Sequence, residues 1–218
     1  MKNLYLLLSF AFLLALSSCN QPEKHQYIEI TTDFGIMKAK LFNSTPLHRE
    51  NMLKLAKEGF YDDLLFHRVR EGFMIQGGDP ESRNAPLTKR LGSGGPGYRI
   101  PAELGAPHIK GALAAARTGG PSNPEKESSG SQFYIVQGTT LDDNQLNGIE
   151  RSKKIAYSQE QRKMYKEVGG APNLDMDYTV YGEVVEGLDV IDKIAAVQKN
   201  GERPVEDVKM TIKLLGEE

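Results

Sequence analysis

The stretch Phe66-His67-Arg68-Val69, continued by Gly72-Phe73-Met74-Ile75-Gln76-Gly77-Gly78-Asp79, is the most informative part of this chain. These residues place one guanidinium, one amide and several large apolar side chains close together. No phosphate-binding loop, pair of acids or thiol accompanies them. Apolar residues around one fixed cation suit chemistry on a neutral group, in which charge rearranges slightly and no bond breaks.

The composition bounds the class of protein. A length of 218 residues suggests one domain, and 39% hydrophobic with 26% charged residues is ordinary for a globular protein. A formal net charge of -2 argues against a nucleic-acid partner. The 22 glycines and 11 prolines imply many turns and favour an all-β fold. The four histidines show no metal-ligand spacing, so we expect neither a metal nor a cofactor.

Residues 1–18 have the features of a bacterial lipoprotein signal peptide. Lys2 supplies the positive start, and residues 4–16 form an apolar run that is short for a membrane span. The run ends in Leu16-Ser17-Ser18-Cys19, which resembles the lipobox that precedes a lipidated cysteine. We therefore expect Cys19 to carry the lipid. The alternative is an ordinary secretory signal with an incidental cysteine.

The same segment predicts where the protein resides. Cys19 is the only cysteine in the chain, which excludes an intrachain disulfide. Acyl chains on Cys19 would anchor the protein by burying methylene groups at about 0.8 kcal/mol each. Residues 19–26 then form a short polar tether to a domain that spans residues 27–218. Asn20 stands where Asp is the inner-membrane retention signal, which favours the outer membrane of the cell envelope, facing the periplasm.

Three segments alternate apolar and polar residues, as strands with one buried face do. Residues 27–32 and 36–42 flank the turn Asp33-Phe34-Gly35 and predict a hairpin. Residues 208–214 predict a strand near the C-terminus. Because both ends of the domain are strands, we expect them to meet in a closed sheet.

Two amphipathic helices and a third, mostly polar helix are also predicted. The first spans residues 45–59, and the second spans about residues 188–197. The third spans residues 158–168, where Ser158 and Gln161 are spaced as a capping box. We expect this third helix to lie on the surface, within an insertion.

Two further motifs resemble ligand-binding loops but fail on closer inspection. Residues 92–97 match a dinucleotide-binding pattern, yet Pro96 and Pro101 block the helix that should hold the pyrophosphate. Residues 142–150 resemble a calcium loop, yet Leu146 stands where a ligand oxygen is needed. We therefore expect a tight turn in the first segment and a solvated turn in the second.

Together with three later segments, the opening stretch resembles the cyclophilin family of peptidyl-prolyl cis-trans isomerases. The later segments are Gly111-Ala112-Leu113-Ala114-Ala115-Ala116-Arg117, Gly130-Ser131-Gln132-Phe133-Tyr134-Ile135 and Tyr178-Thr179-Val180-Tyr181-Gly182-Glu183-Val184. The resemblance covers residues 27–215 and is interrupted by insertions at residues 119–129 and 139–172. It implies an all-β fold: a closed eight-stranded antiparallel β-barrel capped by two α-helices, with an extra surface helix in an insertion.

The resemblance also implies the residues of the site. Arg68, Phe73 and Gln76 fall on catalytic positions of the family. The substrate-binding positions are Met74, Ala116, Arg117, Gln132, Tyr134, Leu174 and Tyr178. Two of these depart from the family's pattern, because Tyr134 stands where Phe is usual and Tyr178 where His is frequent. No metal ligand is implied.

The expected function is that of a peptidyl-prolyl cis-trans isomerase that rotates X-Pro bonds and assists the folding of exported proteins. Its partners would be proline-containing polypeptides, and we expect a monomer. A non-catalytic module that binds proline peptides, or a chaperone, is the alternative. Arg68 favours catalysis, since binding alone would not demand a cation. A scaffold role for residues 158–168 stays open. His67 is interpreted as a residue of the barrel whose polar groups are satisfied, with a proton carrier as the alternative.

Overall fold

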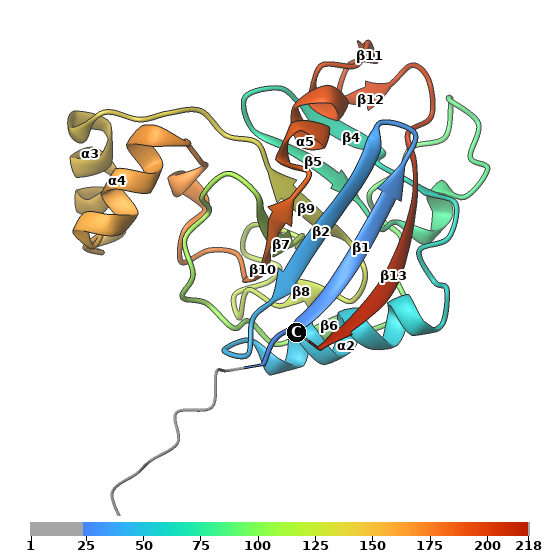
Figure 1. Cartoon of the computed structure of the whole chain (residues 1–218), viewed down its shortest axis with the longest axis horizontal. Helices are drawn as coiled ribbons and strands as arrows, with labels where there is room; N and C mark the ends of the chain where they lie inside the picture. Colours follow the sequence, from blue (N-terminus) through green and yellow to red (C-terminus); the bar gives the residue numbers. More distant parts are fainter. Residues whose placement is uncertain (1–23, 218) are drawn as a thin grey trace, which may run out of the picture.

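The computed structural model describes residues 24–217, which form a curled antiparallel sheet with helices at its ends and at one side (Figure 1). The strands of this sheet are β1 (Gln26–Thr32), β2 (Gly35–Leu41), β3 (Leu64–Leu65), β4 (Arg68–Arg70), β5 (Met74–Gly77), β7 (Ala112–Ala115), β9 (Phe133–Val136), β10 (Val180–Glu186) and β13 (Lys209–Glu217). They pair in the order β3-β13-β1-β2-β10-β7-β9-β5-β4. Two short ladders join β6 (Arg99–Ile100) to β8 (Ser128–Ser129) and β11 (Lys199–Asn200) to β12 (Arg203–Pro204).

The predicted signal peptide, residues 1–18, and the predicted lipidation site, Cys19, lie outside the described residues. Strand β1 begins at Gln26, which is the last residue of the segment expected to be a tether. No helix within residues 24–217 combines the length and the apolar character that crossing a bilayer would require.

The predicted hairpin and the predicted C-terminal strand are confirmed, and they lie next to each other. β1 pairs with β2 on one side and with β13 on the other, so that Ile30 stands beside both Met37 and Ile212. These three side chains are buried, as the alternation of side chains along a strand requires. The two ends of the domain are therefore held together by one ladder.

The sheet differs from the predicted closed eight-stranded barrel. It has nine strands, and its two end strands, β3 and β4, do not pair with each other within residues 24–217. Only Phe66 and His67 separate them along the chain, and the Phe66 N–H donates to the Val208 carbonyl at 2.9 Å. Because β3 pairs with β13 while β4 pairs with β5, the backbone itself, rather than a ladder, joins the two ends of the sheet.

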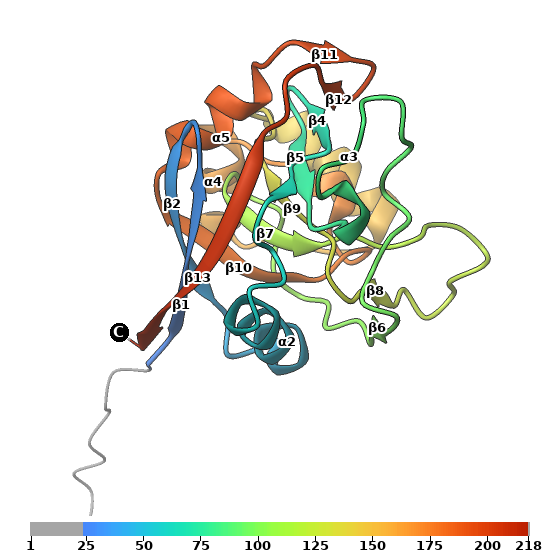
Figure 2. The same ribbon diagram turned by 90° about the vertical axis from the view of Figure 1, so that its right-hand side faces the viewer.

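Two helices cover the two ends of the curled sheet, as predicted. Figures 1 and 2 both show α2 (Pro46–Lys57) at one end and α5 (Leu188–Ala195) at the other. Helix α2 buries Met52 and Leu55, and α5 buries Ile191 and Ile194, in one shared core cluster. The two residues of each pair are three positions apart, which places them on the one face of the helix that meets the sheet.

A helical hairpin made of α3 (Asp143–Lys153) and α4 (Gln159–Glu167) stands beside the sheet (Figure 1). Helix α4 confirms the third predicted helix, including the capping box between Ser158 and Gln161. Its mostly polar surface agrees with its expected position in an insertion, although Tyr165 is fully buried. The hairpin as a whole is called the inserted hairpin below.

The solvated turn predicted for residues 142–150 is wrong, because α3 occupies this segment. Asp142 accepts the Gln145 N–H at 2.8 Å, and the Gln145 side chain accepts the Asp142 N–H at the same distance. This reciprocal pair is a capping box, which satisfies two orphan donors at the start of a helix. The comparison with a calcium loop left out the spacing of Asp142 and Gln145, which is that of a helix N-terminus.

Two isoleucines of the β1–β2 hairpin test this core. Ile28 is fully buried, whereas Ile36 is 55% exposed. We expect Ile28→Ala to lower the free energy of unfolding by about 2–5 kcal/mol, since it leaves a cavity in the core. The matched Ile36→Ala should cost less than about 1 kcal/mol. Urea denaturation checks both values, and equal losses at the two positions would contradict the described burial.

Candidate active site

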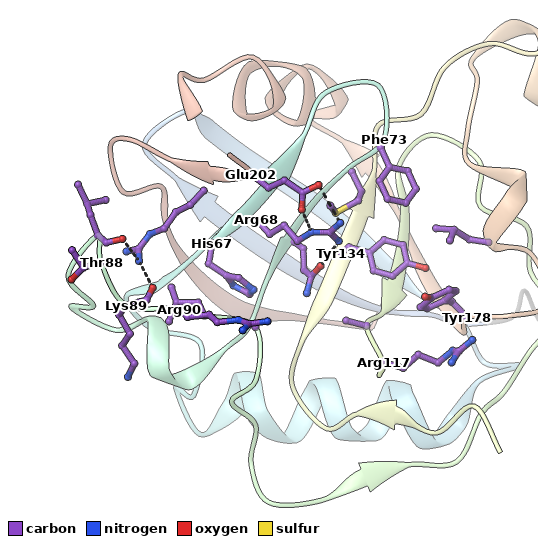
Figure 3. A pocket seen from close by; sticks show the side chains of 18 residues that line it. His67, Arg68, Phe73, Thr88, Lys89, Arg90, Arg117, Tyr134, Tyr178 and Glu202 are labelled. Carbon is purple, nitrogen blue, oxygen red and sulfur yellow. Dashed lines mark hydrogen bonds and ion pairs between the residues drawn. The ribbon is translucent and has the colours of Figure 1, made fainter. Parts of the chain in front are cut away.

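One cavity of about 700 Å³ brings together nearly all of the predicted site residues (Figure 3). Its lining includes Arg68, Phe73, Met74, Gln76, Ala116, Arg117, Tyr134, Leu174 and Tyr178. Gln132 is the exception, since it lines a neighbouring groove together with Gln76. The structure thus gathers residues from distant segments at one place, while their individual roles remain predictions.

The first support of the Arg68 guanidinium is a chain of amides. Arg68 begins β4 and pairs with Gln76 of β5 in the ladder, and its Nη1 donates to Gln76 Oε1 at 3.1 Å. Gln76 Nε2 donates to Gln132 Oε1 at 3.1 Å, and Gln132 Nε2 donates to the Gly94 carbonyl at 2.7 Å. Gln132 therefore supports Arg68 indirectly, through Gln76.

The second support is a carboxylate that sequence analysis missed. Glu202 accepts from Arg68 Nε at 2.5 Å and from Arg68 Nη2 at 3.4 Å, as Figure 3 shows. Glu202 lies in the turn between β11 and β12, where its carbonyl accepts the Val69 N–H at 2.7 Å. The hydrogen bond from Arg68 lowers the pKa of Glu202, so the carboxylate stays ionised. Because 134 positions separate the pair, no local pattern could have indicated it.

Apolar side chains form the wall beside the guanidinium. Met74 of β5 and Tyr134 of β9 are almost fully buried, and Phe73 and Leu174 pack partly buried against them. Leu174 ends the 3₁₀ turn Pro172–Leu174. An apolar wall excludes water, and a charge acts more strongly where water is excluded.

The segment at Ala116 and Arg117 is held by its own hydrogen bonds. The Ala116 N–H donates to the Gln132 carbonyl at 2.9 Å, and its carbonyl accepts the Ser129 N–H at 2.8 Å. The Arg117 guanidinium lies over the Tyr178 ring, 4.6 Å from its centroid. Both main-chain groups of Ala116 are therefore engaged inside the protein, which fixes the backbone of this segment at the cavity.

Sequence analysis also missed the rim that residues 87–92 add to the cavity. Arg203 holds this rim, because its Nη1 donates to the carbonyls of Pro86 and Lys89 at 3.0 Å each. Its Nη2 donates to the Ala85 carbonyl at 3.1 Å. Residues 87–92 show no apolar periodicity, so the sequence did not indicate that they border the cavity. The hydrogen bonds from Arg203 of β12 keep them there.

A buried polar cluster lies behind the aromatic wall. The Tyr134 hydroxyl is 2.8 Å from His108 Nε2, and His108 Nδ1 is 2.7 Å from Asp175 Oδ1. Burial lowers the pKa of His108 despite the hydrogen bond to Asp175, and burial raises the pKa of Tyr134. The imidazole is therefore neutral and the phenol protonated at neutral pH. Sequence analysis did not identify His108 or Asp175.

The described part of the chain offers no obvious metal centre. Within residues 24–217, no group of three or more His, Cys, Asp and Glu side chains is placed to hold an ion. His67 lines the cavity next to Arg68 but is 5% exposed, and burial lowers its pKa. Its imidazole is neutral, as expected of a residue that is not a proton carrier. The expectation that its ring is satisfied is wrong, because both ring nitrogens lack a hydrogen-bond partner within residues 24–217.

Comparison with known proteins gives a consistent result for the sequence. Residues 27–213 match the family described as "Cyclophilin type peptidyl-prolyl cis-trans isomerase/CLD". A Staphylococcus aureus (strain USA300) protein named "Putative peptidyl-prolyl cis-trans isomerase" is 35% identical over 179 residues, which are 81% of this chain and 85% of that protein. A Staphylococcus epidermidis protein with the same name matches equally well.

The fold is shared with solved structures. The crystal structure of a cyclophilin type peptidyl-prolyl cis-trans isomerase from Cryptosporidium parvum has a TM-score of 0.63 at 24% identity and covers 87% of this chain. A second structure of that protein, in the presence of the dipeptide Ala-Pro, has a TM-score of 0.62 at the same identity. At this identity the likeness concerns the fold.

The buried histidines predict how stability depends on pH. Burial lowers the pKa of His48, His67 and His108 below the value of 6.5 that holds for a free side chain. The unfolded chain therefore binds more protons below pH 6.5, so the free energy of unfolding should fall as the pH is lowered from about 7.5 to 5.5. The decline is at most about 1.4 kcal/mol per pH unit for each histidine that stays neutral. Urea denaturation with a His48→Gln control, expected to show a shallower decline, measures this. A midpoint that does not change with pH would refute it.

Proposed function

The chain belongs to the cyclophilin-type peptidyl-prolyl cis-trans isomerases, and from that premise we propose that it isomerises X-Pro bonds of exported polypeptides at the cavity around Arg68. One observation carries this assignment of the site. The Arg68 guanidinium has five N–H donors, of which Glu202 and Gln76 engage three within residues 24–217. Arg68 itself lines the cavity together with Phe73, Met74 and Tyr134, and two of its donors are left for a ligand.

Rotation of an X-Pro bond needs little covalent chemistry. Its barrier is about 18–20 kcal/mol, because rotation breaks amide resonance. In the twisted state the prolyl nitrogen regains a lone pair and becomes an acceptor, while the carbonyl loses negative character. A donor aimed at that nitrogen gains a partner only in the twisted state. This is selective binding of the transition state, which accelerates the reaction.

Arg68 suits this role because its charge and geometry are both fixed. A guanidinium stays charged at any working pH and presents a planar set of donors. Glu202 and Gln76 hold that plane in place before the substrate arrives, so little reorganisation is needed in the transition state. The apolar wall of Phe73 and Met74 tolerates the less polar twisted amide better than water does. A five-decade acceleration would require about 7 kcal/mol from these contributions together.

A non-catalytic module that binds proline segments is the alternative. Such a module needs a pocket of the right shape but has no use for a cation held by two partners. The pairing of Arg68 with both Glu202 and Gln76 therefore favours catalysis. We also propose that the protein works as a monomer.

Replacing the cation tests the proposed site. We expect Arg68→Ala to lower kcat/KM for a short X-Pro peptide at least about tenfold, since the transition-state donor is lost. Arg151→Ala, on the exposed surface of α3, is the control and should leave kcat/KM unchanged. A protease-coupled or NMR exchange assay measures both variants, and circular dichroism confirms folding. If folded Arg68→Ala turns over like the wild type, Arg68 has no part in the mechanism.

We further propose that the protein is a lipoprotein of the bacterial cell envelope. Residues 1–18 would direct export, and Cys19 would carry the acyl chains that hold the domain at the outer membrane, facing the periplasm. The sequence features of residues 16–19 support this, and so does the start of the domain at β1, only a few residues later. Exported chains crossing this compartment would be the substrates.

The anchor is tested by removing the acyl acceptor. In cells that express the full chain, Cys19→Ser should move the protein from the membrane fraction to the soluble fraction and abolish labelling by a radioactive fatty acid. Turnover of a soluble X-Pro peptide should stay within about twofold, because the site lies in the folded domain. Fatty-acid labelling that persists in Cys19→Ser would exclude this residue as the anchor.

A further inference from the structure

The inserted hairpin reaches the active site through two tyrosine hydroxyls. Tyr165 of α4 and Tyr157, just before α4, each donate to Asp175 Oδ2 at 2.6 Å. Their rings pack edge to face, with centroids 5.2 Å apart. Tyr165 is fully buried although its helix is mostly polar. Both tyrosine hydroxyls of the hairpin thus donate to one carboxylate that lies outside the hairpin.

That carboxylate stands directly behind the cavity wall. Asp175 follows Leu174, which lines the cavity, and is only 3% exposed. Its Oδ1 accepts the main-chain N–H of His108 at 2.7 Å. The same oxygen lies 2.7 Å from the ring nitrogen His108 Nδ1. Burial raises the pKa of Asp175, but hydrogen bonds from His108, Tyr157 and Tyr165 outweigh it and lower the pKa overall. The carboxylate is therefore ionised and surrounded by donors.

These partners determine where the protons lie. An ionised Asp175 can only accept, so His108 Nδ1 must carry a proton and donate it. The neutral ring then has a lone pair on Nε2, which faces the Tyr134 hydroxyl at 2.8 Å. Burial keeps that hydroxyl protonated, so Tyr134 is the donor. Hydrogen bonds thus connect the cavity wall to the inserted hairpin and converge on Asp175, which accepts from His108 on one side and from the two tyrosines on the other.

The direction of the last hydrogen bond matters for the cavity. Tyr134 packs among apolar residues that include Met74 and Ala114, so its hydroxyl is a polar group beside an apolar surface. While His108 accepts from it, the hydroxyl is satisfied and the ring alone faces the proline. Without that acceptor, the hydroxyl would place an unsatisfied dipole against the apolar wall, which is unfavourable.

We propose that the inserted hairpin is a positioning element of the active site: Tyr157 and Tyr165 hold Asp175 and His108 so that the Tyr134 hydroxyl stays out of the proline pocket. The four residues behind Tyr134 are positioning residues and do not touch the substrate. The proposal rests on the proposed function of the cavity. It assigns a catalytic use to an insertion whose role the sequence left open.

A double-mutant cycle between the hairpin and the pocket tests the proposal. Tyr165→Phe removes one donor to Asp175 while keeping the ring, and we expect it to lower kcat/KM at least about threefold. In a Tyr134→Phe background there is no hydroxyl to release, so the same change should cost less than about 1.5-fold. An equal loss in both backgrounds, or no loss in either, would overturn the proposal.

Two further variants control for the loss of any buried hydroxyl and for misfolding. Tyr61→Phe removes a buried hydroxyl that donates to the Ser131 carbonyl at 3.3 Å, outside this chain of hydrogen bonds, and should leave kcat/KM within about twofold. If Tyr165→Phe does not fold, Tyr157→Phe replaces it in the cycle, because Tyr157 is only partly buried. A loss of kcat/KM that depends on Tyr134 then supports the proposal, and an equal loss or no loss in both backgrounds overturns it.

Nuclear magnetic resonance of His108 gives a readout independent of turnover. Long-range ¹H–¹⁵N spectra of the wild type should show a neutral imidazole protonated on Nδ1, and Tyr165→Phe should shift both nitrogen resonances. An imidazole protonated on Nε2 would overturn the proposal. If the wild type shows no turnover at all, the proposed function fails, and this spectrum alone decides whether the hydrogen-bond chain exists.

Discussion

The register of β4, β5 and β9 is the constraint on which the site depends. Arg68 stands opposite Gln76, and Gln76 stands opposite Tyr134, so cation, amide and aromatic ring lie side by side across three strands. On the other face of the same strands, Ile75 and Ile135 are opposite each other and fully buried. A slip of one residue would exchange the two faces, so the packing of the core also fixes the active site.

The turn between β11 and β12 supplies the remaining support of the site. Glu202 holds the guanidinium of Arg68. The next residue, Arg203, donates to carbonyls just before the cavity rim, at Ala85 and Pro86, and within it, at Lys89. The turn is itself attached to β4 through the Val69 N–H. The cation and the rim therefore share one support, and a displacement of this turn would disturb both. On the opposite side, the inserted hairpin supports the aromatic wall through Asp175 and His108.

Local signals in the sequence predicted the local features of this fold. Alternation predicted β1, β2 and β13, and the spacing of Ser158 and Gln161 predicted α4, since both depend on neighbouring residues only. The resemblance placed nine site residues around the cavity that the structure contains. Sequence analysis did not identify Glu202, His108 and Asp175, because the residues that they contact are distant in sequence. Helix α3 was not predicted although its capping box is present in the sequence, because the segment was compared with a calcium loop, rejected as one and then interpreted as a solvated turn. The unclosed sheet depends on a break at residues 66–67, which no periodicity marks.

The central claim is that Arg68 binds the twisted amide selectively and contributes little to binding of either ground state. NMR lineshape analysis of one X-Pro peptide, titrated with wild type and Arg68→Ala, measures the Kd of each isomer and the rate of interconversion on the enzyme. We expect both Kd values to change less than about threefold while the rate on the enzyme falls at least about tenfold. A rate on the enzyme that is unchanged, with the whole loss appearing in the two Kd values, would contradict the account.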